Sequence, residues 1–384
     1  MSDNETAQVL PARRSRRPRG LTIAAVLIVL FGVPWWTLVG AGTQWPGVVV
    51  VAATILFING LLALPLLMYL GHGRRSRDWA ARIGDAILGV IWVLFTWALL
   101  GNLLRLALAI GGIADPLRSR IVAVAVITVS LALMLWGCIE AMRVPRIKFV
   151  TVTIGRLARG LHGVRLVLLT DTHFGPINRT RWSTAVVAAV NALDADIVCH
   201  TGDIADGSVV KRRQQAAALA NVRAKHAKVY VLGNHEHFGW AQTWLEHMRR
   251  LGWEPLHNRH MVVHRDGAAL VVAGVDDATA VAPSHYAAAL AGVDPNQPVV
   301  LLAHQPKQID AAIELDIDLQ LSGHTHGGQI WPFHLLVRLV QPSLHGLTRH
   351  GERTQLYTSR GTGFWGPPLR IFAPSEITVL TLNG

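Results

Sequence analysis

The chain has 384 residues, of which 51% are hydrophobic and only 16% charged, and its formal net charge is +12. The length leaves room for two or three domains, and the composition is too apolar for a single soluble domain. Residues 1–146 hold 14 arginines against 6 acidic residues, whereas the remainder is only weakly basic. The high isoelectric point therefore belongs to the N-terminal part, and we expect no nucleic-acid partner.

Four uncharged stretches of close to helical span length lie before residue 142. They cover residues 21–40, 46–70, 86–104 and 121–139. Each is near the roughly 20 residues that a helix needs to cross about 30 Å of hydrocarbon. We therefore predict a basic tail over residues 1–20, four transmembrane helices over residues 21–142, and a multi-pass protein of the cell membrane whose partner is the lipid bilayer.

Arginines flank these spans unevenly. They are concentrated before the first span, between the second and third, and after the fourth, whereas the other two loops offer only Arg118 and Arg120. The positive-inside rule then predicts that both termini, and with them the basic tail and the C-terminal part, are cytoplasmic. The arginine pair in SRRPRG also resembles a twin-arginine export segment. If this segment were an export signal, the C-terminal part would still be cytoplasmic, because the three spans that follow would end inside.

Beyond Pro145 the apolar runs become short and alternate with helical patterns. Strands are expected over 148–154, 164–170, 196–200, 228–232, 299–304, 319–322, 355–358 and 376–382, helices over 181–192, 211–224 and 241–251, and a hairpin over 261–275. The hairpin turns at Asp266-Gly267, a dipeptide that suits positive φ. Strands that alternate with helices and then follow one another predict an α/β layered domain over residues 147–384.

Five polar clusters follow directly after five of these strands. They are Asp171-Thr172-His173, Gly202-Asp203, Gly233-Asn234-His235-Glu236, His304, and Gly323-His324-Thr325-His326-Gly327-Gly328. In open α/β sheets the loops at the carboxyl ends of the strands converge on one binding site. We therefore expect the five clusters to form a single site.

The residue types in these clusters are those of a metal centre. Carboxylate, imidazole and amide oxygen suit Mn, Fe, Zn or Mg, whereas a soft metal would require thiolates. Asp203 has two carboxylate oxygens and is the natural bridge between two ions, and the glycines before Asp203, Asn234 and His324 allow close backbone approach. One histidine at a strand end is more often a structural residue, but the ordered set indicates two divalent metal ions and a phosphoester hydrolase.

The five clusters in chain order resemble the motifs of the calcineurin-like metallophosphoesterase superfamily, which are D-x-H, G-D, G-N-H-[DE], H and G-H-x-H. The resemblance covers about residues 148–384. The stretches GHTHGGQIWPF and RGTGFWGPPLRIFAPSEITVLTL resemble its bacterial membrane-associated branch, which includes lipid A precursor phosphodiesterases. The resemblance implies a two-sheet β-sandwich flanked by helices. It also implies two ligand sets, Asp171, His173, Asp203 and His326 for the first ion, and Asp203, Asn234, His304 and His324 for the second.

Two ions held about 3.5–4 Å apart can lower the pKa of a shared water and present hydroxide in line with phosphorus. His235 lies beside the implied ligands and is the expected catalytic residue, which would stabilise or protonate the leaving oxygen. Asp206 or Glu236 would orient these groups. The expected reaction is the hydrolysis of a phosphodiester or pyrophosphate.

Four spans hold such a site near the bilayer, which favours a lipid-linked or headgroup phosphoester as substrate. Phosphoproteins and nucleotides are alternative substrates. A membrane signalling protein with a binding-only domain is a further alternative. Two observations argue against it: no ligand position is missing, and the spans contain almost no charge apart from Arg105, so that no ion path is indicated.

Two segments near the motifs allow two interpretations each. The apolar residues 330–340 (IWPFHLLVRLV) are either a lipid-facing lip that admits an acyl chain, or a strand or helix that packs into the core. Residues 363–366 (GFWG) are either an aromatic rim or a packed turn.

Overall fold

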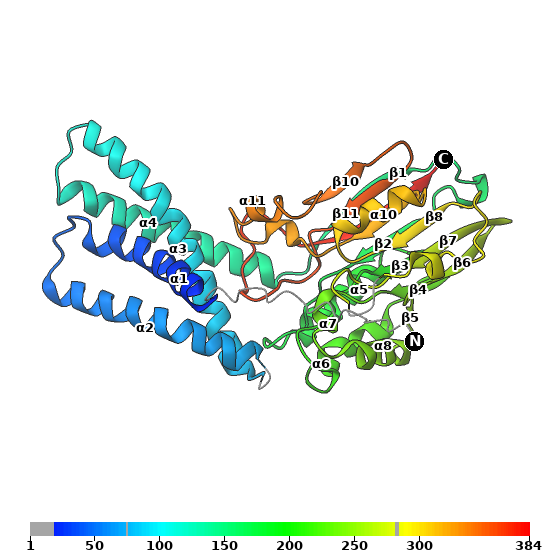
Figure 1. Cartoon of the computed structure of the whole chain (residues 1–384), viewed down its shortest axis with the longest axis horizontal. Coiled ribbons are helices and arrows are strands. Elements are labelled where there is room, and N and C mark those ends of the chain that lie inside the picture. Colours follow the sequence, from blue (N-terminus) through cyan, green and yellow to red (C-terminus); the bar gives the residue numbers. More distant parts are fainter. Residues whose placement is uncertain (1–18, 74–75, 281–283) are drawn as a thin grey trace, which may run out of the picture. The chain divides into compact units, whose positions relative to one another are not determined.

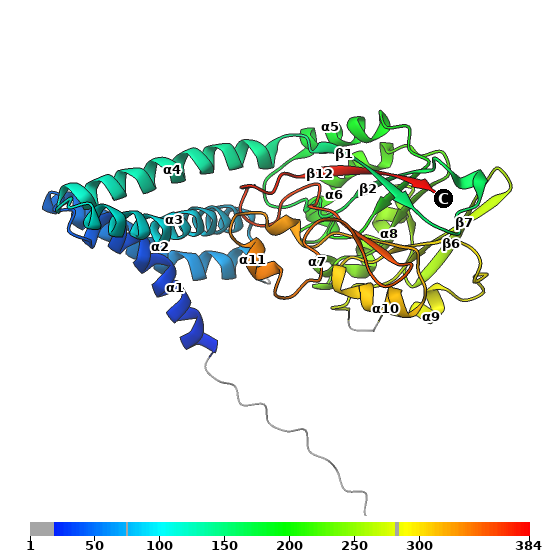
Figure 2. The same ribbon diagram turned by 90° about the horizontal axis from the view of Figure 1, so that it is seen from above.

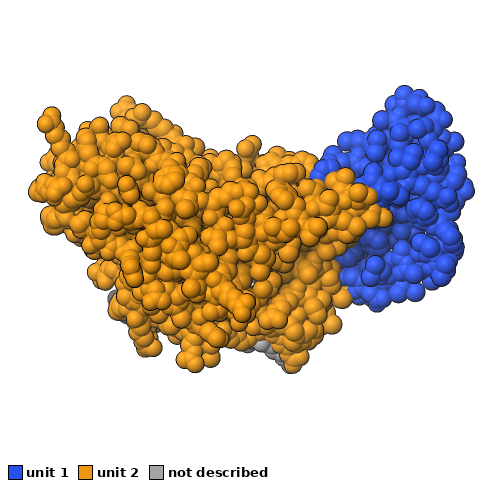
Figure 3. Space-filling view, turned by 180° about the vertical axis from the view of Figure 1, so that it is seen from behind, with its two compact units in different colours: residues 1–62, 97–126 blue, residues 63–96, 127–384 orange. Residues whose placement is uncertain are grey.

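A computed structural model describes residues 19–73, 76–280 and 284–384. Its contacts divide the chain into two units, residues 1–62 with 97–126 and residues 63–96 with 127–384 (Figure 3). The division runs through long helices, so that parts of α2, α3 and α4 belong to each unit. The predicted basic tail lies outside the described residues except for its last two positions.

Four helices of the described part are long and apolar enough to cross a membrane, as predicted. They are α1 (Arg19–Trp35), α2 (Gly47–His72), α3 (Asp78–Ile110) and α4 (Leu117–Met142), and a π-helical turn, Trp36–Gly40, continues α1. The 33 residues of α3 span about 50 Å, which exceeds the hydrocarbon thickness of about 30 Å. Its first turns carry Asp78, Arg82 and Asp85, so we place that end outside the hydrocarbon.

Two pairs of polar side chains form hydrogen bonds inside the first unit. Asn102 donates a hydrogen bond of 2.7 Å to the hydroxyl of Thr37, and the indole of Trp35 donates one of 2.9 Å to Thr54. Such pairs satisfy polar groups that lipid cannot.

The second unit contains two six-stranded mixed sheets (Figure 1). The first has the order β1-β12-β2-β3-β4-β5, with β1 (Arg146–Thr153), β12 (Glu376–Asn383), β2 (Arg165–Leu169), β3 (Ile197–His200), β4 (Ala227–Tyr230) and β5 (Glu254–Pro255). The second has the order β10-β11-β9-β8-β7-β6, with β10 (Gly346–Arg349), β11 (Gln355–Thr358), β9 (Leu319–Ser322), β8 (Val299–Leu302), β7 (Ala268–Gly274) and β6 (Arg259–Arg265). In each sheet four neighbouring strands run parallel, β2 to β5 in the first and β11, β9, β8 and β7 in the second.

The two sheets pack face to face around one core. Along β2, Leu166 and Leu168 lie in the cluster shared with the second sheet, whereas Val167 and Leu169 lie in a cluster with the helices of the outer face. Both faces of the strand are covered, which is why it reads as a continuous apolar run. The predicted two-sheet sandwich flanked by helices is confirmed.

Helices cover the outer face of each sheet. The first sheet is covered by α5 (Thr180–Asn191), α6 (Val209–Ala216) and α8 (Ala241–Arg250), and the second by α9 (Tyr286–Ala289) and α10 (Ile309–Glu314). In Figure 2, α5 and α10 accordingly lie on opposite sides of the strands. Two short helices, α7 (Asn234–His237) and α11 (His334–Val337), lie in the loops after β4 and β9.

Two expectations from the sequence need correction. The helix expected over 211–224 is α6 followed by a 3-10 segment, Ala217–Asn221, because the Asn191 side chain bonds to the carbonyl of Asn221 and the N–H of Arg223. Packing of residues 330–340 into the core holds for Ile330, which is buried, but is wrong for most of the segment, since Leu335, Leu336, Leu339 and Val340 are 49–79% exposed.

Candidate metal centre

The five polar clusters converge as their positions predict. They follow β2, β3 and β4 of the first sheet and β8 and β9 of the second, which are all parallel strands within their sheets. Three groups of side chains result whose oxygen and nitrogen atoms lie within 4.8 Å of one another and could hold a metal ion. These groups are Asp171-His173-His326, His173-Asp203-His235 and Asp203-His304-His324.

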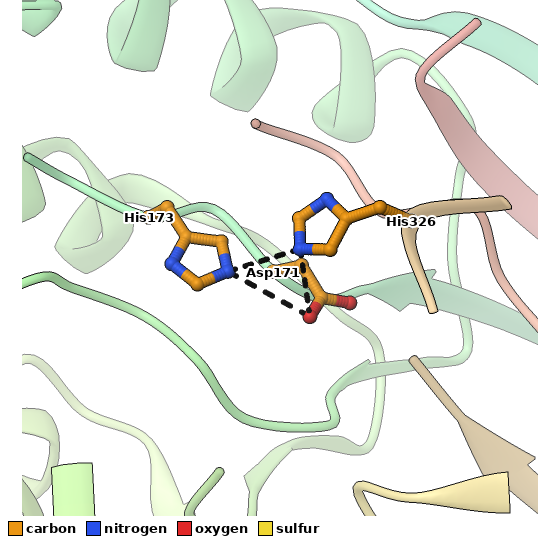
Figure 4. A group of neighbouring side chains, drawn as sticks. All are labelled: Asp171, His173 and His326. Atoms are coloured by element: carbon orange, nitrogen blue, oxygen red, sulfur yellow. Dashed lines mark hydrogen bonds and ion pairs between the residues drawn. The ribbon is translucent and has the colours of Figure 1, made fainter. Parts of the chain in front are cut away.

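Asp171, His173 and His326 point their potential metal-ligand atoms at one another (Figure 4). The Nε2 atoms of the two histidines lie 3.1 Å apart. Oδ1 of Asp171 lies 3.5 Å from Nε2 of His326 and 3.9 Å from Nε2 of His173. Oδ2 of Asp203 lies 3.6 Å from Nε2 of His173, so the ligand set implied for the first ion is gathered around one point.

Asp203 also faces the second group. Its Oδ2 lies 3.3 Å from Nε2 of His304. Oδ1 of Asn234 lies 3.0 Å from Nε2 of His304 and 2.9 Å from Nδ1 of His324. The ligand set implied for the second ion is therefore also gathered, and Asp203 lies between the two sets.

The protonation of His304 shows that these residues fit a cation. Its Nδ1 lies 2.8 Å from the carbonyl oxygen of Thr201, which can only accept, so Nδ1 carries the proton of the neutral ring. The lone pair on Nε2 then faces the oxygens of Asn234 and Asp203. Hydrogen-bond acceptors this close together repel one another unless a cation lies among them. Oxygen and imidazole nitrogen atoms are ligands that suit a divalent metal ion.

Charges within the site support this reading. Burial would raise the pKa of Asp203, but the neighbouring charges of His304 and His235 outweigh burial and hold it well below its usual value. Burial would lower the pKa of His304, yet Asp203 and Asp171 raise it well above its usual value. The centre therefore keeps an ionised carboxylate between the two ligand groups.

Most of the candidate ligands have an unusual backbone conformation. Positive φ angles occur at Asp171 (52°), His173 (41°), Asp203 (54°), His324 (68°) and His326 (51°). This region costs about 1–2 kcal/mol per residue for L-amino acids. Hydrogen bonds between the loops hold the conformation, as when the N–H of His173 donates to the carbonyl of Asp203 and that of His324 to the carboxylate of Asp171.

Two glycines bring the loops close to the carboxylates. A Cβ atom on Gly233 would overlap Oδ1 of Asp203, and one on Gly323 would overlap Oδ2 of Asp171. Neither position can carry a side chain without displacing a candidate ligand. The close approach expected at these glycines is present.

Two acidic residues connect the ligand loops. Oδ1 of Asp206 lies 2.9 Å from Nδ1 of His173 and 2.7 Å from Nδ1 of His235. Glu236 is buried and accepts the N–H groups of Asp203, Gly233 and Ala205. Asp206 is therefore placed to orient two imidazoles, whereas Glu236 holds the backbone.

Two buried arginines near the centre were not predicted. Arg370 donates from Nη1 to the carbonyl of His326 and from Nε to that of Gly363. Arg179 donates to the carbonyl of His173, and its guanidinium lies between the rings of Trp182 and Phe364 at 4.1 and 4.4 Å. The only sign in the sequence is an arginine within an apolar or aromatic stretch, which does not by itself indicate a buried cation.

Residues 164–328 match the family model described as calcineurin-like phosphoesterase. The chain is 34% identical over 327 residues to a transmembrane protein with metallophosphoesterase domain from Danio rerio, a match that covers 79% of this chain and 74% of the relative. The chain belongs to the calcineurin-like metallophosphoesterase family.

Two bacterial relatives named uncharacterized metallophosphoesterase agree with that assignment. The relative from Helicobacter pylori strain J99 is 40% identical over 251 residues, which cover 64% of this chain and 66% of the relative. The relative from Campylobacter jejuni is 34% identical over 302 residues, which cover 76% and 79%.

This calcineurin-like metallophosphoesterase is accordingly a metal-dependent phosphoester hydrolase. It is also a membrane protein with four candidate spans, in keeping with the name of its Danio rerio relative. The binding-only alternative is therefore disfavoured.

Proposed function

We propose that this metallophosphoesterase is a membrane-anchored phosphodiesterase or pyrophosphatase that uses two divalent ions to hydrolyse a lipid-linked or headgroup phosphoester at the cytoplasmic surface. The observation that carries the proposal is the position of Asp203 between two groups of ligand atoms, 3.6 Å from His173 on one side and 3.3 Å from His304 on the other.

In this proposal the two ligand sets implied by the sequence hold one ion each, with Asp203 shared. Such ions, when bound, would neutralise charge on the phosphoryl oxygens and lower the pKa of a water molecule. The chain itself supplies fixed ligand positions, because Glu236 accepts the backbone N–H groups of Asp203 and Gly233 and so joins the two neighbouring loops that carry Asp203 and Asn234.

His235 is the proposed general acid. Asp206 holds its Nδ1 at 2.7 Å, which leaves Nε2 directed toward Asp203 at 3.9 Å. From this position Nε2 can pass a proton to the leaving oxygen. The rings of Phe238 and Trp365 lie 5.2 and 6.3 Å from the His235 ring and would limit access of water.

The lining of a small cavity beside the metal centre supports a substrate at the membrane. It includes His173 and Asp206 of the centre together with Arg82 and Asp85 of α3. The first turns of α3 are fixed there, since Asp78 pairs with Arg212 through two contacts of 2.7 and 2.8 Å. A candidate span thus contributes directly to the walls next to the reacting centre.

The chemistry can be tested on the full chain in detergent with bis-p-nitrophenyl phosphate and Mn²⁺. We expect hydrolysis that EDTA abolishes, and loss of turnover and of bound Mn²⁺ in Asp203→Ala. Asp310→Ala, an exposed acid on α10, is the matched control. Full turnover by Asp203→Ala at limiting metal would contradict the binuclear assignment.

The substrate class requires a separate comparison. Phospholipids and nucleotide-linked glycolipids, presented in detergent, should be hydrolysed faster than soluble nucleotides or phosphopeptides. Equal or faster hydrolysis of the soluble substrates would leave the reaction intact and reject the lipid substrate.

The proposed cytoplasmic orientation rests on the arginine distribution. Reporter fusions after residue 146 should give a cytoplasmic signal, and fusions after residue 112, between α3 and α4, a signal from the other side. A periplasmic signal after residue 146 would reverse the orientation.

A further inference from the structure

We propose that a second pocket, distinct from the metal centre, binds the phosphate-bearing headgroup of an anionic membrane lipid. The pocket has a volume of about 180 Å³, which is below the roughly 300–1,000 Å³ of sites for drug-sized ligands but several times the roughly 30 Å³ of one water molecule, so it has room for a phosphate group. Its walls come from α11, from the loop after β9 and from the loop before β12. Prominent among them are Gly328, His334, Arg338, His345, Arg360 and Phe372.

The charged side chains that line this pocket are all basic. Arg338 and Arg360 contribute two permanent positive charges, and no acidic side chain lines the walls. Within the described residues, neither arginine forms an ion pair. Cations gathered without counter-ions favour an anionic ligand.

Arg360 is the most informative of these residues. Its Nη2 lies 3.1 Å from Nε2 of His345, and its Nε is buried and has no hydrogen-bond partner in the described part of the chain. Glu376 accepts only the backbone N–H of Arg360 and lies beyond ion-pair distance of the guanidinium. A buried guanidinium N–H without an acceptor is unfavourable, and an anion bound in the pocket beside this guanidinium would offset part of that cost through its charge.

Exposed apolar side chains lie in the same chain segment as His334 and Arg338 of the pocket wall. Leu335, Leu336, Leu339 and Val340, in or just after α11, are exposed, as is Phe372 on the pocket wall. Basic residues beside an exposed apolar helix are typical of segments that lie at a membrane interface. A soluble phosphate compound would make no use of this apolar surface.

The same unit places the pocket next to the candidate spans. The Phe333 ring lies 5.7 Å from that of Trp92 in α3, and the Phe372 ring lies 5.5 Å from that of Trp136 in α4. The backbone N–H of Arg370 donates to the carbonyl of Gly137 in α4. Tryptophans are enriched where spans leave the hydrocarbon, at the level of the lipid headgroups, so headgroup phosphates are the anions expected at this pocket.

The pocket is separate from the two proposed ligand sets. None of the seven candidate metal ligands lines the pocket, although Gly327 and Gly328 in its wall directly follow His326. Lipid binding here therefore needs neither bound metal nor turnover, and the two proposals can fail independently.

The test measures lipid binding by the full chain in detergent after EDTA treatment, with dioctanoyl phosphatidylglycerol, dioctanoyl phosphatidylcholine and inorganic phosphate as probes. We expect phosphatidylglycerol to bind most tightly. Arg338→Gln should weaken its binding about fivefold, and the double variant Arg338→Gln/Arg360→Gln further, in line with about 1 kcal/mol per basic residue at a membrane surface. Arg338 is exposed, so its single variant tests the pocket even if the double variant does not fold.

The matched control removes the same charge elsewhere. Arg223→Gln/Arg249→Gln changes two exposed arginines that lie outside the pocket, and phosphatidylglycerol binding should stay within twofold of that of the parent chain. Equal losses in the control and pocket variants would reject a localised site. Inorganic phosphate that binds as tightly as the lipid would reject the lipid as ligand, and unchanged binding in Arg338→Gln would reject the pocket.

Discussion

The carbonyl oxygen of Thr201 lies 2.8 Å from Nδ1 of His304 and fixes which ring nitrogen carries the proton. The two residues lie in loops that follow strands of different sheets, β3 and β8. The contact leaves Nε2 of His304 with a lone pair among the oxygens of Asp203 and Asn234. The folded chain therefore needs a cation at this point, either a proton or a metal ion.

Metal binding should compete with protons. Because neighbouring carboxylates raise the pKa of His304 above its usual value despite burial, a bound ion must displace the proton from Nε2. We expect Mn²⁺ affinity to rise between pH 6 and pH 8 with release of protons, measured by calorimetry in two buffers of different ionisation enthalpy. Saturation at a hundredfold excess over the Kd should stabilise the fold by about 2.7 kcal/mol, and pH-independent affinity would contradict this account.

His235→Gln should lower turnover by about 10²–10⁴-fold, the usual contribution of a general acid. The loss should be large for a phosphodiester with an alkyl alcohol as leaving group and much smaller for p-nitrophenol, which leaves without protonation. Bound metal, measured by elemental analysis, should be unchanged. His226→Gln, an exposed histidine, serves as control, and equal losses for both leaving groups would remove the acid role.

Asp206→Asn should lower both turnover and metal affinity, each by about 10–100-fold, because the carboxylate bonds Nδ1 of His173 and of His235. Asp310→Asn should leave both values unchanged. A variant that loses turnover but keeps full metal affinity would restrict the role of Asp206 to His235.

Glu236→Ala should destabilise the catalytic part, since the N–H groups of Asp203, Gly233 and Ala205 lose their acceptor. Each buried group left unpaired costs about 1–3 kcal/mol. We expect a clear fall in the apparent unfolding temperature, followed by circular dichroism in detergent. Glu314→Ala, an exposed acid on α10, should change it little, and an unchanged unfolding temperature in Glu236→Ala would show that water replaces the carboxylate.

Gly323→Ala should weaken metal binding more than it weakens the fold, because its Cβ would occupy the place of Oδ2 of Asp171. Gly155→Ala is the matched control, as its Cβ would meet open space. Mn²⁺ titration together with thermal unfolding separates the two effects. Metal affinity equal to that of the parent chain would mean that the loop can move away without displacing Asp171.

Much of this protein follows from local sequence patterns. The four spans could be predicted from the length of the segments and their lack of charge, and the buried strands from continuous apolar runs. Both features are properties of neighbouring residues in the chain. The candidate ligands could be named because each follows such a strand. The helix expected over 211–224 failed for the opposite reason: Asn191, in a different helix, binds the backbone at Asn221 and Arg223.

Other features depend on residues far apart in the chain, and only the tertiary structure decides them. The proton on His304 is set by a carbonyl 103 residues away, and the unpaired charge of Arg360 matters only because Arg338 lines the same pocket. The sequence alone could determine which residues bear the chemistry, since strand ends are encoded locally. The tertiary structure decides which of their atoms face one another and which of their charges stay unpaired. Both depend on how the two sheets pack together with the turns of α3 and α4 that belong to the same unit.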